Sequence, residues 1–159
     1  MIVIADASPL IALGRVGRLD LLQSIFGELA IPDAVWHEVV EADPAKPGSK
    51  EIATATWIRK LQVRDLGLVS LLRHDLGAGE AEAIVLARET SADFLLMDER
   101  LGRSAAQRLG LKAVGLVGVL VEARERGLLL DPENLVDKLH LEAGFWISAD
   151  LRKLITGVD

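Results

Sequence analysis

Four acidic residues lie where the chain could bring carboxylates together for chemistry. Asp6 and Asp98 each follow a short apolar run, Glu80 opens a stretch with helical spacing, and Glu38 lies among the apolar positions of an earlier helical stretch. Carboxylates that converge without a cation repel one another, whereas Mg²⁺ and Mn²⁺ prefer oxygen ligands. The four acids therefore predict a metal site, and such a site could activate water to hydrolyse a phosphodiester.

Helical geometry separates the two acids of the Gly79–Ile84 stretch. Successive residues of a helix turn by about 100°, so Glu80 and Glu82 cannot face the same site. Glu80 shares its stripe with Ile84 and Ala87, which is the spacing of a buried face, whereas Glu82 shares its stripe with Glu89. We expect Glu80 to face inward and Glu82 to face water.

Two alternatives stay open for the other acids. Glu41 competes with Glu38 as the inward-facing acid of its helix, although fewer apolar residues flank it. Asp6 could instead carry a phosphoryl group, as in haloacid-dehalogenase-like enzymes. That family's pattern has a second Asp two residues later, and this chain has Ser8 there.

Alternating strand and helix patterns define the scaffold that must position these acids. The strand patterns are apolar throughout, which is typical of a parallel sheet covered by helices on both sides. We therefore predict an α/β fold with three α/β/α layers, a central parallel sheet and extra C-terminal helices. In such sheets, sites lie beyond the carboxyl ends of the strands, where Asp6 and Asp98 are expected. The predicted strands are 2–5, 29–31, 61–63, 94–97 and 112–114.

Capping residues mark where several helices begin. Ser8, followed by Pro9, predicts the start of one helix that continues through Leu22. Asp33, Asp131 and Ser148 open later helices. Further helical patterns cover 51–58, 80–89, 100–109 and 116–126, and the type of segment 66–75 is left open.

Length and composition limit the classes of protein. We expect one domain over residues 1–159, with a core of about 1–126 and a helical extension of about 131–156. Half of the residues are hydrophobic and the mean hydropathy is +0.31, which favours a homodimer that covers apolar surface. A net charge of −6 argues against a protein that simply coats nucleic acid, but not against an enzyme that reaches phosphates through a metal. The chain has no Cys, secretory signal or membrane span, so we expect a cytoplasmic protein.

The ordered acids and their surrounding motifs resemble the PIN domain, a family that includes the VapC-type toxin ribonucleases. The resemblance rests on Ile-Val-Ile-Ala-Asp-Ala-Ser at the N-terminus, the helix that contains Glu38, Gly-Glu-Ala-Glu-Ala-Ile and Leu-Leu-Met-Asp-Glu-Arg, and it runs from Met1 to about Val114. It implies that Mg²⁺ or Mn²⁺ is bound and that RNA is cleaved. The implied metal ligands and catalytic residues are Asp6, Glu38, Glu80 and Asp98.

The resemblance also implies supporting residues and partners. Ser8 often accompanies such a site, Glu99 adjoins Asp98, and Arg103 could guide an RNA phosphate, with plain surface charge as the alternative. A toxin would have an antitoxin whose Arg or Lys reaches the carboxylates. The third acid is usually Asp in the toxins and is Glu80 here, and residues 115–148 look like a little-characterised PIN-like branch. The alternative function is a PIN-like module that binds protein or RNA without cleaving it.

Overall fold

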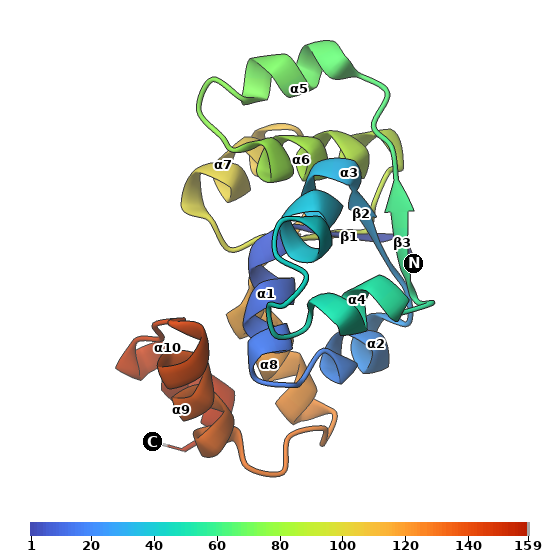
Figure 1. Cartoon of the computed structure of the whole chain (residues 1–159). Coiled ribbons are helices and arrows are strands. Elements are labelled where there is room, and N and C mark those ends of the chain that lie inside the picture. Colours follow the sequence, from blue (N-terminus) through green and yellow to red (C-terminus); the bar gives the residue numbers. More distant parts are fainter. Residues whose placement is uncertain (159) are drawn as a thin grey trace.

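Short apolar runs form four of the five strands of the computed structural model, which describes residues 1–158. Within these residues the strands build one sheet in which every neighbouring pair is parallel, in the order β3-β2-β1-β4-β5. Helices lie on both sides of the sheet, which confirms the predicted three-layer α/β fold (Figure 1). The strands are β1 (Val3–Ala5), β2 (Leu29–Pro32), β3 (Ile58–Leu61), β4 (Phe94–Leu96) and β5 (Ala113–Val114).

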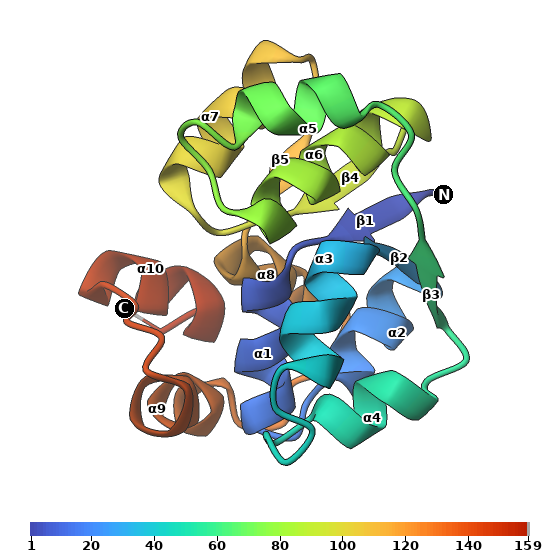
Figure 2. The ribbon, with the colours of Figure 1, turned by 45° about the horizontal axis from the view of Figure 1, so that its top comes forward.

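The strand order creates a switch point between β1 and β4. From β1 the chain continues to β2 and β3 on one side, and it then returns to place β4 on the other side of β1. Helices α1 (Ala7–Arg15), α2 (Asp20–Phe26) and α8 (Leu116–Glu125) lie on one face of the sheet, and α6 (Ala78–Glu89) and α7 (Arg100–Arg108) lie on the other (Figures 1 and 2). Open parallel sheets bind ligands outside the carboxyl ends of their strands at such a point.

Helix α6 is the central helix of its layer and packs against β1, β2 and β4. Its side chains Ala81, Ala83 and Ala87 are fully buried together with Ile84. Small side chains allow the helix backbone to approach the sheet closely, and the surrounding core fixes the helix in place. The first turn of α6, which carries Glu80, is therefore held firmly relative to the ends of β1 and β4.

The predicted N-terminal helix is wrong in two respects. It begins at Ala7, so Asp6 and not Ser8 occupies the cap position. It also ends at Arg15, and α2 begins separately at Asp20. Gly17 lies between the two helices with φ +69°, a left-handed conformation that interrupts a right-handed helix.

The third strand lies earlier than predicted. Ile58–Leu61 pairs with β2, whereas the pattern predicted 61–63, and the preceding helix α4 (Ser49–Thr54) is correspondingly shorter. This strand is at the edge of the sheet, where charged residues such as Lys60 are normal, so its polar composition hid it. Lys60 Nζ lies 5.4 Å from the ring centre of Trp36. The segment whose type was open forms α5 (Leu66–Leu72).

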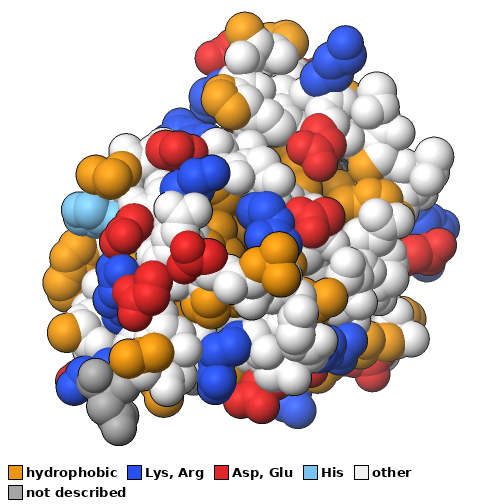
Figure 3. Space-filling model, turned by 90° about the horizontal axis from the view of Figure 1, so that it is seen from below, with side chains coloured by type: hydrophobic (Ala, Val, Ile, Leu, Met, Phe, Trp, Pro, Cys, Tyr) orange, Lys and Arg blue, Asp and Glu red, His pale blue; other side chains and the backbone are white. Residues whose placement is uncertain are grey.

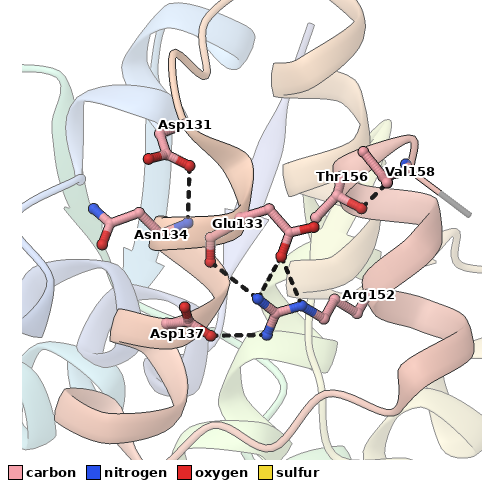
Figure 4. Close-up of polar contacts among 7 residues, drawn as sticks. All are labelled: Asp131, Glu133, Asn134, Asp137, Arg152, Thr156 and Val158. Atoms are coloured by element: carbon pink, nitrogen blue, oxygen red, sulfur yellow. Dashed lines mark hydrogen bonds and ion pairs between the residues drawn. The ribbon is translucent and has the colours of Figure 1, made fainter.

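Two further helices follow the sheet, and both begin at the predicted caps. Helix α9 (Pro132–Ala143) packs on α1, and α10 (Ala149–Thr156) packs on α8 and α9. Arg152 joins them, since its Nε donates to Glu133 Oε2 at 3.0 Å and its Nη1 donates to Asp137 Oδ1 at 2.9 Å (Figure 4). These contacts hold the C-terminal helices as a pair beside the core.

One face of the molecule mixes charges of both signs (Figure 3). On the face shown in Figure 3, acidic and basic side chains alternate among scattered apolar ones, without one broad basic area. None of the helices in residues 1–158 has the length and apolar character needed to cross a membrane.

Candidate metal centre

Asp6 is the most buried acid of the predicted set. It follows β1, and its backbone N–H donates to Leu96 O of β4 at 2.9 Å, which fixes it at the switch point. Its side chain is only 3% exposed and makes no capping hydrogen bond to α1. The pKa of Asp6 is raised from 3.8 to about 7, chiefly by burial and also by the charges of Glu80, Glu38 and Asp98, against a lowering hydrogen bond from the Ala7 backbone. The three other acids therefore all disfavour the charged form of Asp6.

Glu38 and Glu80 share a hollow with Asp6. Helix α3 (Asp33–Trp36) continues into η1 (His37–Glu41), a π-helical turn closed by the hydrogen bond from Ala42 N–H to His37 O at 2.8 Å. Such turns are rare and occur often at functional sites. Glu38 of this turn lines a hollow of about 300 Å³ together with Asp6, Ser8 and Glu80. Glu41 points elsewhere and lies 3.9 Å from His37 Nδ1.

One point in the hollow locates two carboxylates relative to each other. A methyl group placed on Gly79 would lie 3.5 Å from Glu38 Oε2 and 3.6 Å from Asp6 Oδ1. Both oxygens therefore face the same space above the first turn of α6, although Asp6 and Glu38 are far apart in the sequence.

Glu80 also faces Glu99, which was expected near the site because it adjoins Asp98. Burial raises the pKa of Glu80, and the charge of Glu99 and a hydrogen bond with its carboxyl group raise it further. Glu99 is itself the cap of α7, because its Oε2 accepts the Gly102 N–H at 2.8 Å. The first turns of α6 and α7 thus bring another acid to the rim of the site.

Asp98 follows β4 and turns toward α8. Its Oδ1 accepts the Leu116 N–H at 2.7 Å, and its Oδ2 is buried and has no hydrogen-bond partner among residues 1–158. Burial raises the pKa of Asp98, while the Leu116 hydrogen bond and the charge of Arg103 lower it. Asp98 lines a second hollow with Arg100 and Arg103, and it is not among the residues that line the hollow of Asp6.

The donor chemistry of these residues fits a hard divalent cation. All the charged ligands on offer are carboxylate oxygens, as Mg²⁺ and Mn²⁺ prefer, and the unpaired Asp98 Oδ2 is an oxygen that a cation would satisfy. Within residues 1–158, however, no three acids or histidines lie close enough to enclose an ion as they stand. Asp6, Glu38 and Glu80 line a space that could receive a cation, but they do not form a closed cage.

The prediction that Glu82 faces water is wrong. Glu82 does point away from Glu80, but its Oε1 accepts the Ala34 N–H at 3.1 Å and so caps the start of α3. It is half-buried between α3 and α6, which pack against each other. The sequence offered no signal for this contact, because the two helices meet only in the folded chain.

Comparison with known proteins gives one result for nearly the whole chain. A family model described as a PIN domain matches residues 2–157, which includes the C-terminal helices. No curated protein matches the chain significantly.

Proposed function

Because this chain belongs to the PIN-domain family, whose members are generally nucleases, we propose that it is a Mg²⁺- or Mn²⁺-dependent ribonuclease. Asp6, Glu38, Glu80 and Asp98 hold the metal and form the catalytic site. The observation that carries this proposal is the buried Asp6, which faces Glu38 and Glu80 across one hollow and feels the charge of all three other acids. Burying the Asp6 carboxylate beside other acids is costly for folding, and a cationic ligand would offset that cost.

The residues have separate tasks in the proposed reaction. A divalent ion bound there would lower the pKa of a water and neutralise charge on the phosphate. Asp6 and Asp98, anchored at the ends of β1 and β4, set the position of the ligand oxygens. Glu38 and Glu80, on helical first turns, can orient the attacking water by accepting its hydrogen bond. Ser8 is exposed at the rim of the same hollow and can donate to a phosphate oxygen.

Cleavage of RNA with and without metal tests the proposal. Purified protein with Mn²⁺ should cleave a single-stranded RNA, EDTA should stop the cleavage, and Asp6→Asn should abolish it. Glu82→Gln is the matched control, because it removes a nearby charge outside the hollow and should leave cleavage intact. Equal cleavage by wild type and Asp6→Asn would show that the activity comes from elsewhere.

A non-catalytic PIN-like interaction module is the second candidate. It is favoured by the lack of three acids that enclose an ion within residues 1–158. Titration calorimetry separates the two functions, since the enzyme should bind Mn²⁺ at or below millimolar concentration and the module should not bind it.

The toxin resemblance implies one partner. We propose a small antitoxin that places an Arg or Lys against the carboxylates, and a short reading frame beside the gene would support it.

We also propose a homodimer. Three leucines are largely exposed: Leu66 (68%) and Leu71 (65%) of α5, and Leu101 (57%) of α7. Leu71 and Leu101 line a hollow of about 520 Å³. Light scattering on the purified chain decides the oligomeric state.

A further inference from the structure

Helix α7 presents a polar face directly beside the carboxylates. Arg100, Arg103, Ser104 and Gln107 recur at intervals of three or four residues, which places them on one stripe of the helix. With Asp98 they line a hollow of about 370 Å³. Because Asp98 belongs to the proposed metal site, this hollow is the immediate extension of that site along α7.

Arg103 is the central cation of this face. It is half-buried, and within residues 1–158 its guanidinium makes no ion pair or hydrogen bond. A guanidinium has five N–H donors in a fixed fork, and leaving them without partners in a partly desolvated place is unfavourable. The group is therefore suited to an anionic oxygen ligand that comes from outside the chain.

Gly115 explains how Arg103 is placed. A methyl group on Gly115 would lie 2.8 Å from Arg103 Nη1 and 2.9 Å from Asp98 Oδ1. The guanidinium and the carboxylate therefore meet above the same backbone atom, and only a glycine leaves room for both. Within residues 1–158 they do not approach each other within ion-pair distance, so the donors of Arg103 stay available.

We propose that this α7 face is a subsite for an RNA phosphodiester next to the one that is cleaved. Arg103 holds its two non-bridging oxygens through the guanidinium fork, Arg100 adds charge, and Ser104 and Gln107 contact the adjoining sugar or base. The inference rests on the proposed ribonuclease function. It adds that the RNA strand leaves the carboxylates along α7, which gives the bound strand a direction.

Binding without cleavage tests the subsite independently of catalysis. Fluorescence anisotropy is measured in EDTA over a range of salt concentrations with a labelled single-stranded RNA of about 12 nucleotides. This length lies within the site sizes of proteins that bind single strands. Arg103→Gln should weaken binding roughly 10-fold, the loss typical of a charged hydrogen-bonding partner. The slope of log affinity against log salt should fall by about 0.7, as expected for one lost phosphate contact on a single strand.

The control is Arg59→Gln, which removes one exposed positive charge at the amino-terminal edge of the sheet, where Arg59 lies near Met1 and Thr90. It should bind RNA like the wild type. Arg103→Lys, which keeps the charge and loses the fork, should recover part of the affinity and shows that the loss is not a folding defect.

Several outcomes overturn the subsite: no RNA binding by the wild type at low salt, unchanged binding by Arg103→Gln, or an equal loss in Arg59→Gln. Tighter Arg103-dependent binding of a polyglutamate peptide than of RNA would replace the RNA with an acidic protein partner. Binding that depends on Arg103 without Mn²⁺-dependent cleavage would retain the subsite and refute the nuclease. Mn²⁺-dependent cleavage by Arg103→Gln with an unchanged KM would retain the nuclease and refute the subsite.

Discussion

Replacing Asp6 by Asn should stabilise the metal-free protein at alkaline pH. The folded chain raises the pKa of Asp6 from 3.8 to about 7, chiefly by burial. The folded state therefore binds this proton more tightly than the unfolded chain does. As the pH rises from about 4 to about 7, the free energy of unfolding falls, and above this range the whole penalty is present.

The shift of about 3 pKa units corresponds to about 4 kcal/mol at 1.36 kcal/mol per unit. Between about pH 5 and about pH 8 the free energy of unfolding of the wild type should fall by about 3 kcal/mol through Asp6. Asp6→Asn should not show this loss, because its amide has no charge to bury. For a domain of this size, a difference of about 3 kcal/mol changes the melting temperature by roughly 10 °C.

Urea unfolding in EDTA near both pH values measures this effect. Asp75→Asn, which alters an exposed acid, is the control and should follow the wild type. Mn²⁺ at about 100 times its Kd should remove most of the difference between the wild type and Asp6→Asn at alkaline pH, because it adds about 2.7 kcal/mol to the wild type alone. The reasoning is refuted if Asp6→Asn loses stability with rising pH in parallel with the wild type in EDTA.

Two further changes separate the acids by role. Glu80→Gln should abolish Mn²⁺ binding in calorimetry, whereas Glu82→Gln should bind Mn²⁺ like the wild type, because its amide oxygen can still accept the Ala34 N–H. Gly115→Ala should push Arg103 or Asp98 aside and lower Mn²⁺ affinity roughly 10-fold, as changes behind metal ligands commonly do. Unchanged affinity in Gly115→Ala would mean that the added methyl group does not disturb a metal ligand at Asp98.

The strand-end acids were the predictable part of the site. Asp6 and Asp98 follow apolar runs, and the rule that parallel sheets gather their carboxyl ends at one edge is enough to bring them together. Glu38 could not be separated from Glu41 by pattern, because the π-helical turn that carries it changes the helical phase. The pairing of Glu80 with Glu99 depends on how α6 and α7 meet, and local sequence does not encode that contact.

The fold was predicted where periodicity was strong and missed where it was weak. The buried strands β1, β2 and β4 were recognised from their continuous apolar character. The edge strand β3 carries Arg59 and Lys60 at its centre, so hydrophobic pattern alone placed it too late. The break between α1 and α2 depends on the backbone of Gly17, whose presence was visible but whose left-handed conformation was not.

The acids of the proposed site differ in how much space surrounds their side chains, and this difference leads to a final prediction. Asp6 is 3% exposed and its backbone is bonded to β4, so a longer side chain has no space to fold back. Glu80 is half-buried on the rim of the hollow, where its side chain has space to change length. Asp6→Glu should therefore lose Mn²⁺ binding in calorimetry and cost roughly 1–3 kcal/mol of stability through overpacking, whereas Glu80→Asp should retain binding. If both conservative changes reduce Mn²⁺ affinity equally, the site does not consist of a fixed acid at the sheet and an adaptable one at its rim.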